Sequence, residues 1–235
     1  MAMWVVRMFV LASLVAVIGC GGSDDAEQAQ QTTSTTTASA VCGEGAVEPV
    51  TLTTDDGVEL AAVLVGEGDV GVVLGHQLRS DYCSWVPCAK ELASRHVSAL
   101  AINFASVSPD DDMVAGAREL QRRGAERIML AGASMGGTAA LVAAARVDAA
   151  GVASLSGPRE FGGLDALSYV RRLDVPALFL AAQDDAGFVD DARTLYRATK
   201  SRDKALVITT GFEHGTDLLG DPKARRALLD FLVSG

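Results

Sequence analysis

A serine set between two glycines is the first feature of this sequence that could do chemistry. Residues 132–136 read Gly-Ala-Ser-Met-Gly, which places Ser134 at the centre of a Gly-x-Ser-x-Gly pattern. An apolar run, Arg127–Ala133, precedes the serine and an alanine-rich run follows it at 137–147, so we predict a strand, a tight turn and a helix in direct succession. The turn crowds the backbone, and the flanking glycines relieve that crowding. A hydroxyl presented there could act as a nucleophile if a base removes its proton.

Three histidines could supply that base. His76 follows an early apolar run, and His96 lies between a predicted helix and a predicted strand. His214 lies between two glycines in residues 211–215, after the last apolar run and before the closing helix. This position completes the chain order serine, acid, histidine, so we expect His214 to be the general base. We expect His76 to brace its loop and His96 to have no chemical role.

The elements that must position these side chains alternate between strand and helix. Apolar runs predict strands at 47–54, 58–66, 70–75, 97–104, 127–133, 151–156, 176–182 and 205–210. Helical spacing predicts helices at 84–95, 113–123, 137–147, 164–172, 189–199 and 222–233. Asp55-Asp56-Gly57 between the first two strands predicts an antiparallel hairpin. Strands that are apolar throughout and are followed by helices indicate a mostly parallel sheet of about eight strands, covered on both faces.

This arrangement resembles the α/β-hydrolase superfamily, especially its small members without a cap, such as the dienelactone hydrolases. The resemblance covers the chain from about residue 47 to its end, and only about twenty residues separate 156 from 176, too few for a large cap. It implies the α/β-hydrolase fold, with Ser134 as nucleophile and His214 as base. The family's acid lies three residues beyond a small residue, and Ala182-Gln-Asp-Asp185 fits this pattern. We therefore favour Asp185 over Asp184 as the group that orients the imidazole.

The resemblance also implies a pair of backbone donors for the developing oxyanion. One is the amide of Met135, and the other is expected from the loop that follows the strand at 70–75, at Leu78. Gln77 departs from the family, because it stands where glycine is common, and its own amide is the alternative donor. No cofactor is implied, and no Cys/His cluster has metal-ligand spacing.

The expected reaction is the hydrolysis of carboxylic esters or lactones through an acyl-enzyme. The site should be open and bounded by loops that carry Arg79, Tyr82, Phe161 and Phe188. Acyl transfer or amide hydrolysis on the same three residues is one alternative. A non-catalytic binding protein that keeps the fold is another.

The N-terminal residues predict export and anchoring. Residues 1–19 contain one charge, Arg7, and an apolar stretch at 8–18 that is short for a membrane span but typical of a signal peptide. The stretch ends at Cys20 in a sequence that resembles the bacterial lipobox, in which the cysteine is acylated, for example with palmitate. We therefore expect a lipoprotein held on the extracytoplasmic side of a membrane through Cys20. Residues 20–45 are rich in Ser, Thr and Gln and predict a flexible tether, and 46–235 form the hydrolase domain.

Charge and cysteine content narrow the possible partners. The net charge is −10, and no basic cluster offsets it, so a nucleic-acid partner is not expected. The expected partners are a small ester and the membrane that holds the lipid, and the sequence leaves the oligomeric state open. Cys42, Cys83 and Cys88 could form one disulfide in an oxidising compartment, with three pairings possible.

Overall fold

The computed structural model describes residue 42 and residues 47–234, and its main feature is one eight-stranded sheet. The strand order is β1-β2-β4-β3-β5-β6-β9-β10. The strands are β1 (Glu48–Thr53), β2 (Glu59–Val65), β3 (Val70–Gly75), β4 (Val97–Ile102), β5 (Arg127–Ala133), β6 (Gly151–Leu155), β9 (Ala177–Ala182) and β10 (Lys204–Thr209). β1 pairs antiparallel with β2, and β2 antiparallel with β4, whereas all remaining neighbours pair in parallel. The predicted hairpin and mostly parallel sheet are confirmed.

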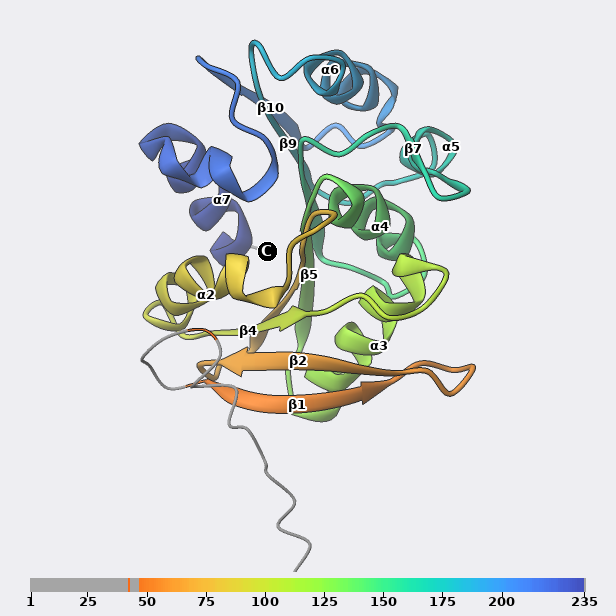
Figure 1. Cartoon of the computed structure of the whole chain (residues 1–235), viewed down its shortest axis with the longest axis vertical. Helices are drawn as coiled ribbons and strands as arrows, with labels where there is room; N and C mark the ends of the chain where they lie inside the picture. Colours follow the sequence, from red (N-terminus) through yellow and green to blue (C-terminus); the bar gives the residue numbers. More distant parts are fainter. Residues whose placement is uncertain (1–41, 43–46, 235) are drawn as a thin grey trace, which may run out of the picture. The chain divides into compact units, whose positions relative to one another are not determined.

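Helices cover both faces of the sheet (Figure 1). The helices are α2 (Val86–Ala93), α3 (Pro109–Arg122), α4 (Met135–Ala144), α5 (Ala166–Val170), α6 (Phe188–Ala198) and α7 (Pro222–Ser234), with 3-10 turns η1 (Tyr82–Trp85) and η2 (Gly215–Gly220). α2 and α7 pack on one face, and α3, α4 and α5 pack on the other. The central parallel strands β3, β5, β6 and β9 are therefore buried on both sides, apart from Arg127 at the start of β5, which explains why they read as continuous apolar runs, whereas the edge strand β10 is mostly half-buried.

The carboxyl ends of the parallel strands share one edge of the sheet, and the segments that carry Gln77, Ser134 and His214 follow strands at this edge. The loop after β3, drawn in gold in Figure 1, lies in front of the sheet near the start of α4. The start of this loop is held by Trp85, which is fully buried and donates from Nε1 to the carbonyl oxygen of Gly75 at 2.9 Å. In open α/β sheets ligands bind at this edge.

Two helices begin earlier than the sequence pattern predicted. α3 begins at Pro109 rather than at 113, because proline is favoured in the first turn of a helix and the three aspartates that follow it complement the helix dipole. α4 begins at Met135 rather than at 137, because the helix starts directly from the turn at Ser134. The second correction matters for the site, since it places the amide of Met135 in the first turn of a helix.

The segment between β6 and β9 contains no large cap. Residues 156–176 hold a hairpin of two-residue strands, β7 (Glu160–Phe161) and β8 (Leu164–Asp165), and the single turn of α5. The hairpin and η2 were not predicted, because such short elements leave no periodic pattern in the sequence.

Several predictions fall on residues outside those that the structure describes. The signal peptide at 1–19, the lipid site at Cys20 and the tether up to residue 41 are among them. Within 42 and 47–234, no helix is both long and apolar enough to cross a membrane.

Candidate active site

Ser134 lies on a strained turn between β5 and α4. Its backbone has φ 50° and ψ −116°, a conformation that a residue with a side chain adopts only when its surroundings enforce it. Two backbone hydrogen bonds hold it there: Ser134 N donates to Leu155 O at 2.8 Å, and Thr138 N donates to Ser134 O at 3.1 Å. The strand-turn-helix setting predicted for this serine is present.

The two glycines of the Gly-x-Ser-x-Gly pattern allow backbone contacts that a side chain would block. An ideal Cβ on Gly132 would lie 2.0 Å from Gly136 O, and one on Gly136 would lie 2.3 Å from Gly75 O and 2.8 Å from His76 O. The close approach at Gly136 brings the start of α4 against the loop that follows β3. The glycines therefore close the turn and join it to the expected oxyanion loop.

Asp185 and His214 meet across the loops that follow β9 and β10. The Nδ1 of His214 lies 3.0 Å from Oδ2 and 3.1 Å from Oδ1 of Asp185. Asp185 is buried, whereas its neighbour Asp184 is exposed. The backbone amide of Asp184 donates to Gly211 O at 2.8 Å. Because the carboxylate accepts the proton on Nδ1, Nε2 is left as the basic nitrogen. Of the two candidate acids, the structure brings only Asp185 to the imidazole.

The segment after β10 that carries His214 and runs into η2, here called the histidine loop, packs against the turn at Ser134. An ideal Cβ on Gly215 would lie 3.3 Å from the Cβ of Ala133, which places the residue after His214 beside the residue before Ser134. Gly215 N also donates to Ser156 Oγ at 3.2 Å, in the loop after β6. Within the described residues, the Ser134 hydroxyl and the His214 imidazole are not hydrogen-bonded to each other. Contacts between nucleophile and base of this kind commonly tighten only when substrate binds.

The expected oxyanion donors lie on either side of the junction between the β3 loop and α4. The amide of Met135 is in the first turn of α4, where backbone N–H groups have no acceptor within the helix. On the β3 loop, Gln77 O accepts from Ser80 N at 3.2 Å and from His76 Nδ1 at 2.8 Å. The side chain of Leu78 is 58% exposed. The assignment of Met135 and Leu78 as the two donors stays a prediction.

His76 braces this loop, as predicted. Its Nδ1 donates to Gln77 O, and its Nε2 accepts from Phe104 N at 3.3 Å, which links the loops after β3 and β4. Burial lowers the pKa of His76, although the hydrogen bond to Gln77 opposes the shift. The imidazole is therefore neutral at physiological pH and serves as a rigid connector.

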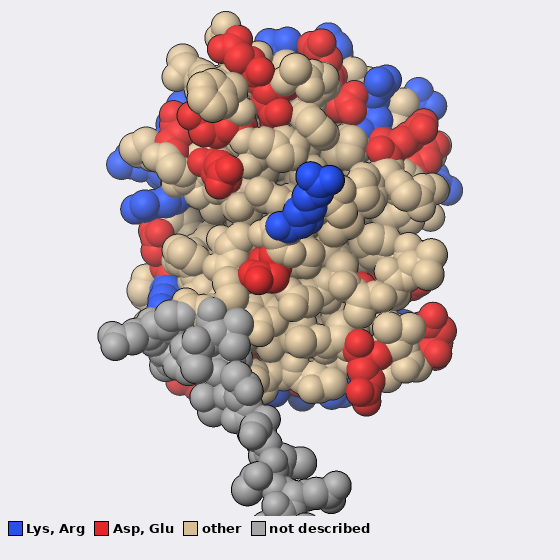
Figure 2. All heavy atoms as spheres, in the orientation of Figure 1, with Lys and Arg blue, Asp and Glu red and all other residues tan. Residues whose placement is uncertain are grey.

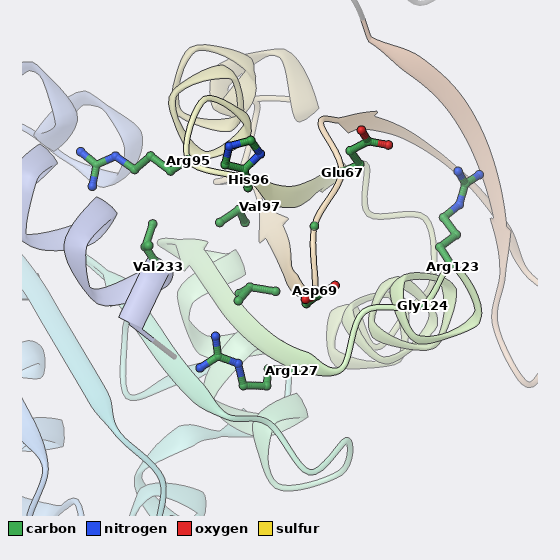
Figure 3. Close-up of a pocket in the computed structure, with 11 residues that line it drawn as sticks. Glu67, Asp69, Arg95, His96, Val97, Arg123, Gly124, Arg127 and Val233 are labelled. Atoms are coloured by element: carbon green, nitrogen blue, oxygen red, sulfur yellow. The ribbon is translucent and has the colours of Figure 1, made fainter.

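His96 lies at the opposite edge of the sheet, where it lines a wide hollow (Figure 3). The hollow has a volume of about 650 Å³ and is lined by residues at the amino ends of β3, β4 and β5, including Asp69, Arg95 and Arg127. Ser134, Asp185 and His214 do not line it. Its size therefore does not mark the site of the expected chemistry.

The residues expected to bound the site occupy different environments. The ring of Phe188 packs on His214, with 4.3 Å between ring centroids. Tyr82 N donates to Asn103 Oδ1 at 2.8 Å, Arg79 is exposed with φ 61°, and Phe161 belongs to the hairpin β7–β8. Phe188 is thus in contact with a residue of the expected triad.

Sequence reasoning missed two contacts that hold the histidine loop. The Oε1 of Gln77 accepts from Thr216 N at 2.9 Å and from Thr216 Oγ1 at 3.0 Å, and Ser156 Oγ accepts from Gly215 N. The departure from glycine at Gln77 was visible in the sequence, but its partner, 139 residues away, was not.

The structure selects one of the three open cysteine pairings. Cys42 and Cys83 form a disulfide, which ties the segment before β1 to η1, directly after the β3 loop. Cys88 is a buried free thiol, and burial raises its pKa to about 12. No group of three or more His, Cys, Asp or Glu within 42 and 47–234 is arranged to hold a metal ion.

Comparison with solved structures identifies the architecture. An esterase of Pyrococcus furiosus superposes with a TM-score of 0.69 at 18% identity, covering 80% of this chain and 90% of that one. A dienelactone hydrolase of Anabaena variabilis gives 0.68 at 20% identity, covering 80% and 95%. A monoacylglycerol lipase of Paleococcus ferrophilus gives 0.65 at 19% identity, covering 75% and 99%. No protein-family model and no curated protein sequence matches the chain. The chain has the α/β-hydrolase fold.

Proposed function

We propose that this protein, which has the α/β-hydrolase fold, is a serine hydrolase that cleaves carboxylic esters through an acyl-enzyme. One observation carries the proposal. A buried carboxylate, Asp185, accepts from Nδ1 of His214, on a loop that packs beside the strained turn of Ser134. This arrangement supports Ser134 as the nucleophile, His214 as the base and Asp185 as the group that orients the base.

In the first half of the proposed reaction, Ser134 Oγ attacks the ester carbonyl carbon while His214 Nε2 takes the hydroxyl proton. The carbon–oxygen bond to the alcohol then breaks, and the imidazolium returns its proton to the departing alkoxide. In the second half, water attacks the acyl carbon while His214 takes a proton from the water. The carboxylic acid then leaves as His214 returns that proton to Ser134 Oγ. Asp185 stabilises the imidazolium in both halves without taking its proton.

The tetrahedral intermediate carries its negative charge on the former carbonyl oxygen. We assign the amides of Met135 and Leu78 as the donors to this oxygen, with Gln77 N as the alternative to Leu78. The dipole of α4 adds to the effect, because its positive end begins at Met135.

The surroundings of the site support an uncharged substrate with an apolar part. Three large apolar side chains are most exposed in the described residues, and each belongs to a loop that follows the carboxyl end of a strand: Leu78 at 58%, Val107 at 98% and Phe212 at 77%. Figure 2 shows mostly uncharged side chains in the middle of its view, with a basic and an acidic side chain standing among them, whereas most charged side chains of both signs lie toward the margins. Esters and lactones fit these surroundings, and the named activities of the structural neighbours agree with that substrate class.

Covalent labelling tests the proposal directly. Wild-type protein should react with a fluorophosphonate and hydrolyse p-nitrophenyl esters, and Ser134→Ala should abolish both. His96→Asn, at the opposite edge of the sheet, is the matched control and should retain both activities. A wild-type protein that neither labels nor hydrolyses any member of an ester panel would favour a non-catalytic binding role.

Acyl transfer and amide hydrolysis use the same covalent step and are separated by product analysis. With an added alcohol in excess of the ester, hydrolysis predicts free acid as the main product. An acyl chain found mainly on the added alcohol would favour a transferase, and release of amine from amide analogues would favour an amidase.

We also propose that the protein is an extracytoplasmic lipoprotein anchored through Cys20. The apolar segment ending at Cys20 supports this proposal, as does the Cys42–Cys83 disulfide, since disulfides persist in oxidising compartments. Cys20→Ala should abolish metabolic labelling with palmitate and move the protein from the membrane fraction to the soluble one. Unchanged membrane retention would contradict the anchor.

A further inference from the structure

We propose that the side chain of Gln77 is a positioning group that locks the histidine loop onto the oxyanion loop. The inference rests on the proposed hydrolase function and adds to it a side chain that does not touch the reacting atoms. A single residue would then set both the place of the general base and the direction of an oxyanion donor.

The side-chain half of this lock is a pair of hydrogen bonds to one residue. Gln77 Oε1 accepts from the backbone N of Thr216 at 2.9 Å and from its Oγ1 at 3.0 Å. Both donors belong to the first turn of η2, directly after His214. Because a backbone N–H can only donate, the oxygen of the amide must be the atom that faces Thr216. The contact thus depends on the acceptor and not on the amide nitrogen.

The backbone half of the lock fixes the peptide that joins Gln77 to Leu78. Gln77 O accepts from His76 Nδ1 and from Ser80 N, so the direction of this carbonyl is held at two points. In a trans peptide the carbonyl and the following N–H point in opposite directions, and the described residues contain no cis bonds. The same hydrogen bonds therefore set the direction of the Leu78 N–H.

The two halves meet at Gly215, where the loops are too close for a side chain. An ideal Cβ on Gly215 would lie 2.5 Å from Gln77 Oε1, and the residue has φ 61°, which favours glycine. Ser156 Oγ holds the amide of Gly215 from the other side. His214 is thus fixed by Asp185 through its ring, and by Gln77 and Ser156 through the two residues that follow it.

A lock of this kind acts on the rate of the chemical step more than on substrate binding. If the histidine loop relaxes, Nε2 loses its position relative to Ser134, and a displacement of about 1 Å can cost about 100-fold in rate. Gln77→Leu keeps the size of the side chain but removes the acceptor. We expect its kcat to fall about 10- to 100-fold with KM changed by less than about threefold.

The matched variants are Thr216→Val and Gln121→Leu. Thr216→Val removes one of the two donors and should lower kcat less than Gln77→Leu does, and the double variant should be no slower than Gln77→Leu alone, because both changes break one interaction. Gln121→Leu makes the same substitution at an exposed position of α3 and should leave kcat unchanged. Hydrogen exchange of the Thr216 amide, measured in parallel, should speed up in Gln77→Leu while the exchange of the core strands does not.

The outcomes separate this inference from the hydrolase proposal. A Gln77→Leu protein with wild-type kcat, or one whose kcat falls only in step with a global loss of exchange protection, would overturn the positioning role while leaving the triad intact. A wild-type protein without ester hydrolysis would overturn the hydrolase proposal and this inference together. Faster exchange at Thr216 in such a protein would then show a purely structural contact.

Discussion

The two edges of the central sheet differ in how their loops are held. At the carboxyl edge, buried or half-buried polar groups from four separate loops are hydrogen-bonded to one another, as in Asp185 with His214 and Gln77 with Thr216. At the amino edge lies the hollow of Figure 3, where Arg95 forms an ion pair with the exposed Asp230, and Arg123 pairs with both the exposed Glu48 and the buried Glu119. Exposed pairs of this kind contribute little to fixing a geometry.

This difference shows that neither volume nor backbone strain alone marks a site in this molecule. Residues with side chains and positive φ occur at both edges, with Ser134 and Ser156 at the carboxyl edge and His96 and Asp148 at the amino edge. What distinguishes the carboxyl edge is that the proposed nucleophile and base lie on loops held by contacts between residues that are distant in sequence. Catalysis requires such fixed placement, whereas a solvated hollow does not provide it.

The largest effect should come from Ser134. Ser134→Ala should lower kcat for ester hydrolysis by at least about 10⁴-fold, because no other group replaces the nucleophile. The thermal midpoint should stay close to that of the wild type, since the change is from a small side chain to a smaller one. Steady-state kinetics and calorimetry check both expectations. Residual activity above one tenth of the wild-type value would show that Ser134 is not the nucleophile, and the carboxyl edge would then not be distinguished by its chemistry.

The pair of neighbouring carboxylates offers the next largest contrast. Asp185→Asn should lower kcat about 10³-fold, because the imidazole loses the group that fixes its tautomer and stabilises its cation. Asp184→Asn changes an exposed side chain and should leave kcat within about twofold of the wild type. Parallel kinetics on the two variants decide the assignment, and the reverse order would exclude Asp185 as the acid.

The disulfide provides a test at the level of stability. Replacing both Cys42 and Cys83 with serine removes a cross-link between residues 41 positions apart. Loop-closure entropy predicts a loss of about 3–4 kcal/mol in the free energy of unfolding. Breaking the exposed ion pair at the amino edge with Arg95→Ala should cost less than about 1 kcal/mol. Urea denaturation compares the two, and equal losses would remove the distinction between a fixed and a loosely held edge.

His76 should make the stability of the carboxyl edge depend on pH. Its folded pKa lies below 6.5, so between that lower pKa and 6.5 the unfolded chain binds more protons than the folded chain. The contribution is therefore fully present above pH 6.5 and is lost as pH falls, by at most about 1.4 kcal/mol per pH unit. His76→Asn should flatten this part of the profile in urea titrations between pH 4.5 and 7.5. An unchanged profile in His76→Asn would contradict this assignment.

The smallest effect should be that of Arg127, which lies in the hollow at the amino edge. Arg127→Ala removes an exposed side chain and should change stability by less than about 0.5 kcal/mol. The rate of ester hydrolysis should remain within about twofold of the wild type. A large loss of activity would show that the hollow at the amino edge takes part in the reaction, contrary to the assignment of the site to the carboxyl edge.

Much of the fold could be predicted from the sequence because each buried strand is a continuous apolar run. Val70–Gly75 and Ala177–Ala182, for example, are buried at every position, so their burial is visible without knowledge of their neighbours. The early starts of α3 and α4 were missed because a proline with three aspartates and a turn through Ser134 do not produce helical periodicity. The order of the strands in the sheet could not be predicted either, because an apolar run marks a strand without indicating its neighbours.

The sequence by itself determined the nature of the site: a serine in a glycine-flanked turn, a histidine after the last strand, and two adjacent carboxylates as candidate partners. These are local features, and local spacing specifies them. Only the tertiary structure decided which carboxylate meets His214, which cysteines pair, and that Gln77 contacts Thr216. Those contacts join residues from 29 to 139 positions apart, and they form because packing of the sheet brings separate loops to one edge. Periodicity along the chain does not predict such long-range contacts, since these contacts depend on how every intervening element packs.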